Sequence, residues 1–194
     1  VDGFSVSAKE LYQTVGTTDT SDEYLIFTAA LSGDDVFYLS DHDEIVNGYA
    51  GDDVIDGATG KDYLMGGEGD DTITLTGNTT YEGLSAHNVG SSSDVATNIK
   101  LDLTGKVKLE TVVDGGADAD TVNLSSNGDA FFLHDSFSGF HSSLALTTDT
   151  HTGGASTQRI LNVETINGLG GDDIIDLTSP DYSLAGQVIT INGG

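Results

Sequence analysis

A nine-residue repeat constrains the fold of this chain more than any other feature of its sequence. Three units follow one another without a gap from residue 48 to 74, with the sequences GYAGDDVID, GATGKDYLM and GGEGDDTIT. Each unit has glycine at place four, aspartate at place six and an aliphatic residue at place eight. Units 30–38 and 39–47 keep an acid and an apolar residue in the same phase. A fixed short period is typical of solenoids, in which each unit packs on its neighbours.

The repeat predicts a parallel β-roll. The first six residues of a unit form a turn whose glycines allow close backbone approach, and the last three form a short strand with its middle side chain inward. Two units complete one coil, so turns eighteen residues apart stack on the same side. Asp53 then lies on Asp71, with the turn of Asp35 below them, while Glu44 and Asp62 lie on the opposite side. The inward column consists of Phe37, Val46, Ile55, Leu64 and Ile73.

The stacked carboxylates predict bound calcium. The chain has 32 acidic and 6 basic side chains, and its formal charge of -26 opposes compaction unless a cation neutralises it. Calcium takes about six to eight oxygen ligands, which carboxylates and turn carbonyls supply. The predicted ligands are Asp35, Glu44, Asp53, Asp62 and Asp71, with the turn glycines Gly48 and Gly66. The alternative is a set of solvated Asp-Gly turns between antiparallel strands, but five units in one phase argue against it.

Two later units repeat the pattern. GGADADTVN at 115–123 places Asp120 at place six and Asp118 where the place-four glycine would stand, and GLGGDDIID at 168–176 places Asp173 at place six. Asp118, Asp120 and Asp173 are therefore further candidate calcium ligands. We expect these isolated calcium units, within 110–123 and 162–176, to anchor single calcium sites at strand ends or to dock beside the main roll and extend it.

The units resemble the RTX family, whose nonapeptide GGxGxDxUx, with U aliphatic, matches residues 66–74 at every fixed place. The resemblance is strong over 48–74 and degenerate over 30–47. It implies a parallel β-roll that folds on calcium, in a bacterial protein exported by a type I secretion system whose signal lies C-terminal to this segment. It also implies an extracellular location, at the bacterial cell surface.

Two segments interrupt the repeat, 76–109 and 124–161, and we expect ligand binding there, because irregular segments on a rigid scaffold carry most binding residues. The alternation of apolar residues over 99–109, broken at Thr104-Gly105, predicts a β-hairpin with one face in a core. The second segment is rich in phenylalanine and histidine and forms either the core of a sandwich or a ligand platform. The candidate ligand-binding residues are His134, Phe137, Phe140 and Arg159, although histidines in loops and a lone arginine paired with carboxylates are the commoner uses.

We therefore predict an all-β protein of one domain, 1–194, that combines a short calcium-bound parallel β-roll over 30–74 with a β-sandwich-like insert. The length and the split calcium units resemble the calcium-dependent peptide-binding domain of giant RTX adhesins. That resemblance implies a monomeric module of a larger chain, which binds peptide C-termini or protein ligands on target cells. The main alternatives are a calcium-stiffened spacer or folding cap without a ligand, and a non-catalytic flank of an RTX toxin or enzyme.

Other functions are excluded or disfavoured by composition and motif. One arginine and five lysines cannot neutralise a nucleic-acid backbone. No cysteine is present for disulfides or thiolate metal sites, and no apolar stretch is long enough to span a bilayer. No nucleophile elbow, HExxH or phosphate-binding loop occurs, so we expect no enzymatic activity. An ice-binding surface needs a regular array of threonines, and the threonines are irregularly spaced along the sequence.

Overall fold

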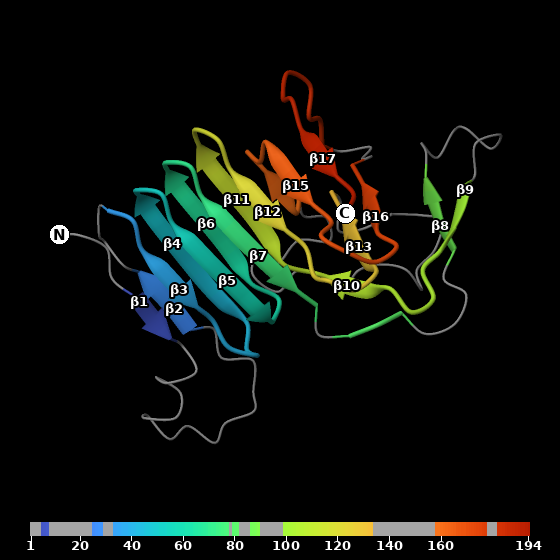
Figure 1. Cartoon of the computed structure of the whole chain (residues 1–194), viewed down its shortest axis with the longest axis horizontal. Helices are drawn as coiled ribbons and strands as arrows, with labels where there is room; N and C mark the ends of the chain where they lie inside the picture. Colours follow the sequence, from blue (N-terminus) through green and yellow to red (C-terminus); the bar gives the residue numbers. More distant parts are fainter. Residues whose placement is uncertain are drawn as a thin grey trace.

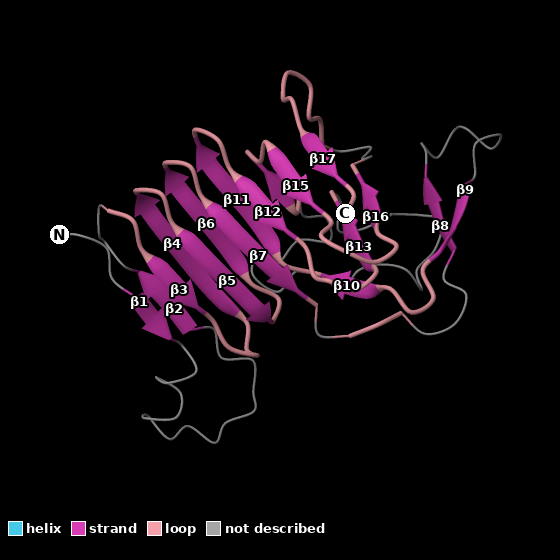
Figure 2. Cartoon of the chain, viewed as in Figure 1, coloured by secondary structure: helices cyan, strands magenta, loops and turns pink. Residues whose placement is uncertain are grey.

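The computed structural model describes residues 5–7, 25–28, 33–77, 79–81, 86–89, 99–133, 158–177 and 182–194. These residues form seventeen β-strands and no helix (Figures 1 and 2), which confirms the all-β class. Accordingly, no helix in the described part of the chain is long and apolar enough to cross a membrane.

Two large parallel sheets build the roll. Sheet A has the order β1-β3-β5-β7-β12-β15-β17 and sheet B the order β14-β11-β6-β4-β2. The strands of sheet A are β1 (Ser5–Ser7), β3 (Val36–Tyr38), β5 (Val54–Thr59), β7 (Thr72–Thr76), β12 (Thr121–Asn123), β15 (Thr165–Asn167) and β17 (Thr190–Asn192). Those of sheet B are β2 (Leu25–Thr28), β4 (Glu44–Ala50), β6 (Tyr63–Glu68), β11 (Val112–Ala117) and β14 (Ile160–Leu161). The chain alternates between the sheets, so consecutive coils stack along the roll (Figure 1).

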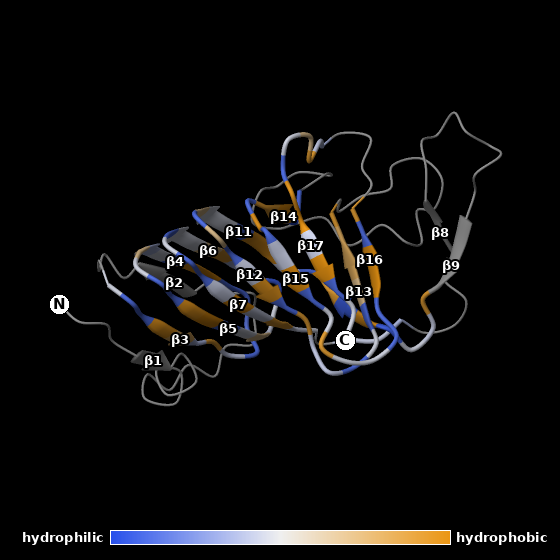
Figure 3. Ribbon diagram, turned by 45° about the horizontal axis from the view of Figure 1, so that its top comes forward, coloured by the Kyte–Doolittle hydropathy of each residue, from blue (hydrophilic) through white to orange (hydrophobic). Residues whose placement is uncertain are grey.

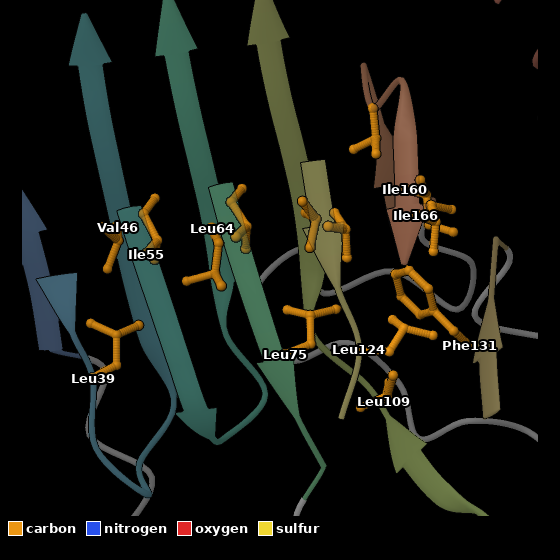
Figure 4. Packing of buried hydrophobic residues seen from close by; sticks show 14 of the residues in the cluster. Leu39, Val46, Ile55, Leu64, Leu75, Leu109, Leu124, Phe131, Ile160 and Ile166 are labelled. Carbon is orange, nitrogen blue, oxygen red and sulfur yellow. The ribbon is translucent and has the colours of Figure 1, made fainter. Parts of the chain in front are cut away.

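The core is the pair of inward columns that the repeat predicts. Phe37, Ile55 and Ile73 are in register on sheet A, and Val46 pairs with Leu64 on sheet B. All five are at most 1% exposed. Polar and hydrophobic residues alternate along the strands (Figure 3), and the hydrophobic side chains of the two sheets meet between them (Figure 4). Burial of these side chains stabilises each coil against its neighbours.

The two later calcium units continue the roll. In sheet B, β11 pairs with β6, and in sheet A, β12 pairs with β7 and β15 pairs with β12. Within the uninterrupted repeat, equivalent residues of neighbouring coils are 18 residues apart in the sequence. Across the two intervening segments they are 49 and 44 residues apart. The strands that follow each intervening segment thus continue the roll in register. Of the two placements expected for these units, the structure shows the extension of the roll.

Sheet C is a third parallel sheet, made of β10 (Val107–Leu109), β13 (Asp129–Phe132) and β16 (Ile174–Asp176). One face contributes Leu109 and Phe131 to the main core, and the other contributes Ala130 and Phe132 to a second cluster with Tyr81. Segment 124–161 therefore begins with a strand of the roll.

The predicted hairpin over 99–109 is wrong. Strand β9 (Ile99–Asp102) pairs antiparallel with β8 (Ala86–Val89), apart from the large sheets (Figure 1), whereas β10 pairs parallel with β13. The turn between β9 and β10 does form, because the Lys106 amide donates to the Leu103 carbonyl at 2.9 Å. Alternation of apolar residues identifies strands with one buried face, but it does not identify the partner strand.

The outward face of sheet A carries two rows of uncharged polar residues. Thr72, Thr121, Thr165 and Thr190 are in register in one row, and Thr74, Asn123, Asn167 and Asn192 are in register in the other. The Asn167 amide donates to the Asn123 side chain, and the Asn192 amide donates to the Asn167 side chain, both at 2.8 Å. The threonines are regular in space although irregular in sequence, because the intervening segments differ in length.

Candidate metal sites at the turns of the roll

A column of carboxylates joins successive coils where the chain passes into sheet A. The backbone amide of Asp35 donates to Oδ1 of Asp53 at 2.7 Å, that of Asp53 to Oδ1 of Asp71 at 2.8 Å, and that of Asp71 to Oδ1 of Asp120 at 2.9 Å. The amide of Asp120 then donates to Oε2 of Glu164 at 2.9 Å. Asp35, Asp53, Asp71 and Asp120 are 1% exposed. The structure thus stacks Asp35, Asp53 and Asp71 as the eighteen-residue period predicts, and Asp120 continues the column across a separation of 49 residues.

The second oxygen of each inner carboxylate lacks a hydrogen bond. Among the described residues, Oδ2 of Asp53, Asp71 and Asp120 is buried without a hydrogen-bond partner. Burial, and then the charges of Asp120 and Asp53, raises the pKa of Asp71 to about 7. Burial and the charge of Glu164 raise the pKa of Asp120 to about 6. Buried anionic oxygens of this kind need a cation, since desolvation disfavours the charged form.

The place-one glycines leave room for that cation. A Cβ added to Gly48 would lie 1.9 Å from Oδ2 of Asp53 and 2.5 Å from the Gly66 carbonyl oxygen. A Cβ on Gly66 would lie 2.0 Å from Oδ2 of Asp71 and 2.5 Å from the Gly115 carbonyl oxygen. The carboxylate of one coil and the carbonyl of the next therefore converge on the space above each glycine.

These donor sets fit calcium. Every converging atom is an oxygen, which suits a hard cation. No group of three or more His, Cys, Asp or Glu side chains that could hold a metal occurs among the described residues. The ligands must therefore include backbone carbonyls, as at Gly66 and Gly115, together with Oδ2 of Asp53, Asp71 and Asp120. Bound calcium would supply the positive charge that keeps these carboxylates ionised in the folded roll.

The opposite edge is less regular. The Glu44 amide donates to Oδ1 of Asp62 at 3.0 Å, and the Asp62 amide contacts Oγ1 of Thr111 at 3.4 Å. Burial raises the pKa of both Glu44 and Asp62. Glu44 also accepts hydrogen bonds from the amide and the hydroxyl of Ser40, and its other oxygen has no hydrogen-bond partner among the residues that the structure describes. Because Thr111 replaces an acid in the next coil, this column of charge ends at Asp62.

A third column of carboxylates lies in the turns that follow β12 and β15. The Asp129 amide donates to Oδ1 of Asp173 at 2.9 Å, and Oδ2 of Asp173 has no hydrogen-bond partner in the described structure. A Cβ on Gly168 would lie 2.3 Å from that oxygen. Asp173 therefore has the same glycine-backed setting as Asp53 and Asp71.

Asp118 occupies the place-four position with a left-handed backbone, φ 81°, as do the place-four glycines Gly51 and Gly69. It is exposed. Its backbone conformation is thus that of the place-four glycines, and its charge contributes to the raised pKa of Asp120.

The place-five aspartates form a reverse ladder. The Asp52 amide donates to Oδ1 of Asp34, the Asp70 amide to Oδ1 of Asp52, both at 3.0 Å, and the Ala119 amide to Oδ1 of Asp70 at 2.9 Å. These carboxylates accept from the following coil, whereas the place-six carboxylates accept from the preceding one. The Asp-Asp pairs therefore bind each coil to both neighbours.

Arg159 is 2% exposed, so its guanidinium is not on the described surface. It lies near Tyr81. Burial and the charge of Glu110 raise the pKa of Tyr81, and the positive charge of Arg159 opposes part of that rise. This setting favours the ion-pair interpretation over an open anion clamp. His134, Phe137 and Phe140 lie outside the described residues.

Sequence reasoning missed Asp129 and Glu164 as members of the columns. Counting nine residues onward from 115–123 gives unit 124–132, with Asp129 at place six and the buried Phe131 at place eight. Counting back from 168 gives unit 159–167, with Glu164 at place six. Both units lack the place-four glycine, which is why the glycine signal did not reveal them.

The parallel sheets and the glycine-backed carboxylates define a cation-binding β-roll. A family model described as RTX calcium-binding nonapeptide repeat (4 copies) matches residues 38–73 and 163–178. The chain thus carries RTX repeats, which bind calcium and are typical of proteins exported by type I secretion and exposed outside the cell. Searches of the curated proteins and of the solved structures gave no match.

Replacing Gly66 with alanine should weaken calcium-dependent folding. The added methyl would lie 2.0 Å from Oδ2 of Asp71, where the cation is expected. Overpacking typically costs about 1–3 kcal/mol, so the calcium concentration at the folding midpoint should rise about fivefold or more. The measurement is a calcium titration followed by circular dichroism. Gly193→Ala is the control, because a Cβ there has nothing within 4 Å; equal midpoints for the two variants would contradict this site.

The calcium-free protein should be more stable at pH 5 than at pH 8. Because the folded-state pKa values of Asp71 and Asp120, about 7 and about 6, exceed the ordinary value of 3.8, the folded state binds more protons. The stability that these two carboxyls contribute is therefore full below about pH 4 and is lost as the pH rises through about 6 to 7. Thermal melting of resin-stripped protein at the two pH values tests this. A melting temperature independent of pH would show that these carboxyls are not buried in the folded state.

Proposed function

We propose that this chain is a calcium-dependent ligand-binding module of a secreted bacterial RTX adhesin, and that it recognises anionic peptide C-termini on target cells. The module is not an enzyme. Calcium loading outside the cell folds the roll, and the folded roll presents the two inserted segments to the ligand. The relevant extracellular calcium sites typically have affinities of about 0.1–1 mM.

A concentration of basic residues where the first insert rejoins the roll supports this proposal. The basic cluster consists of Lys61, Lys106 and Lys108, which are three of the six basic residues of the chain. Nζ of Lys61 lies 3.8 Å from Oε2 of Glu110, and Nζ of Lys108 lies 4.8 Å from the centre of the Tyr81 ring. Glu110, the partner of Lys61, also raises the pKa of Tyr81, whereas Nζ of Lys106 donates to the Asp172 carbonyl.

The basic cluster has the charge that a peptide carboxylate requires. In a protein with a charge of -26, an anionic ligand is repelled almost everywhere else. Lys106 directly precedes β10 of sheet C and Lys108 lies within it, and both residues are half-buried. A spacer has no need to collect its few cations at the base of an insert.

Calcium-loaded protein should bind a peptide with a free C-terminus and not its amidated form. Lys108→Gln should weaken this binding about tenfold or more, because charge-assisted contacts contribute about 1.5–3 kcal/mol, while the calcium midpoint stays unchanged. Lys9→Gln is the matched charge control. Isothermal calorimetry in saturating calcium makes the measurement. Folding with no peptide binding would leave a calcium-stiffened spacer, and equal effects of the two lysine variants would remove the basic cluster from the site.

A second candidate function is ice binding, and the two rows on sheet A favour it. The eight residues of the rows on β7, β12, β15 and β17 are all threonine or asparagine, and none is charged. Strands lie about 4.8 Å apart and alternate residues about 6.6 Å apart, so hydroxyl and amide groups form a regular grid. The Asn123–Asn167–Asn192 hydrogen bonds hold the side chains of one row in place. A regular grid of this kind suits binding to the ordered, uncharged surface of ice.

Ice binding predicts thermal hysteresis of calcium-loaded protein, measured by nanolitre osmometry. Thr121→Tyr, in the middle of the threonine row, should remove most of the effect. Met65→Tyr on the outward side of sheet B is the control and should leave it unchanged. Absence of hysteresis in the wild-type protein, or an equal loss in both variants, would exclude this candidate.

A further inference from the structure

The nonapeptide turns of this roll close in two different ways. In the glycine units that begin at Gly48, Gly66, Gly115 and Gly168, the place-six carboxylate has a buried oxygen without a hydrogen bond among the described residues. In the glycine unit that begins at Gly57, the Thr111 hydroxyl lies 3.4 Å from Oδ2 of Asp62. In unit 124–132, place one is Leu124 and place two is Ser125. Here the Ser125 amide donates to Oδ2 of Asp129 at 2.9 Å, and the Ser125 hydroxyl lies 2.8 Å and 2.9 Å from the two carboxylate oxygens. Both oxygens of Asp129 are therefore engaged.

The backbone separates the same two kinds of unit. Place two has a left-handed φ in all five glycine units: Tyr49, Ala58, Gly67, Gly116 and Leu169. Ser125 is not among the described residues with positive φ. The chain therefore turns differently at the start of unit 124–132.

Leu124 fills the space that glycine leaves open elsewhere. It is 0% exposed and belongs to the main core with Phe131 (Figure 4). Its amide donates to the Asn167 carbonyl at 2.9 Å, and the Gly168 amide donates to the Asn192 carbonyl at 2.7 Å, so Leu124 and Gly168 hold equivalent positions in successive coils. The Leu124 side chain thus fills the space that is open above glycine in the other units. The hydrogen bonds from Ser125 take the place of a cation at the Asp129 carboxylate.

We infer that unit 124–132 closes without calcium, and that the Leu-Ser pair at places one and two distinguishes metal-free turns from calcium turns in this roll. Unit 39–47 has the same pair, Leu39 and Ser40, and Ser40 likewise lacks a positive φ. Ser40 engages one oxygen of Glu44 and leaves the other, so unit 39–47 is a partial form of the same closure. The calcium sites of the roll are set by the residues at places one and two as well as by the place-six acid.

This inference predicts different calcium counts for matched substitutions at place six. Asp71→Asn, in a glycine unit, should lose at least one bound ion per chain. Asp129→Asn should bind as many ions as the wild type, because the asparagine oxygen still accepts from Ser125. Equilibrium dialysis followed by elemental analysis of calcium gives the count, and circular dichroism verifies that each variant is folded.

A second variant keeps the test decisive if Asp129→Asn does not fold. Val107 already holds the equivalent register position to Asp129 in sheet C, so the double variant Ser125→Ala with Asp129→Val reproduces an apolar turn that the protein uses. It should also retain the full calcium count. A count that falls by one ion in either folded variant would overturn the inference. Peptide or ice binding has no part in this measurement, so its outcome is independent of the proposed function.

Discussion

The structure depends on carboxylates that divide their two oxygens between two partners. One oxygen of Asp53, Asp71 or Asp120 accepts the backbone amide of the preceding coil, and the other is left for a cation. The hydrogen bond fixes the position of the side chain, and the glycine behind it leaves space for the metal. Coil stacking, glycine placement and the high negative charge therefore follow from one requirement. Without the cation, burial of these groups is costly, because desolvation of an unpaired charge is unfavourable.

The reverse ladder of Asp34, Asp52 and Asp70 adds hydrogen bonds that run in the opposite direction along the roll. Its residues are exposed, and their carboxylates accept amides of the following coil. Loss of one coil would remove hydrogen bonds from the coils on both sides. In a solenoid, stability is approximately a sum over units and neighbour interfaces, and strong interfaces make the sum cooperative. The consecutive aspartates of the repeat thus have different tasks, although the sequence shows them as a pair.

Much of the roll can be predicted from the sequence because the repeat is local. The phase of Asp53 and Asp71, and the inward direction of Ile55 and Ile73, need only a fixed nine-residue period. The partner of β10 could not be predicted, since strand pairing depends on where a distant segment returns. The threonine rows were hidden for the same reason: the segments between the coils have unequal lengths. Asp129 was missed because its unit lacks the glycines at places one and four.

The register of the coils across the two interruptions has a consequence for how such a protein can change. Because the chain leaves and rejoins the roll at adjacent levels, the ends of each excursion stay fixed whatever its length. Lengthening a loop twofold costs only about 0.6 kcal/mol in closure entropy. The excursions can therefore be exchanged, lengthened or diversified while the coils above and below keep their pairing. The coils of the roll can therefore stay constant while the inserted segments vary.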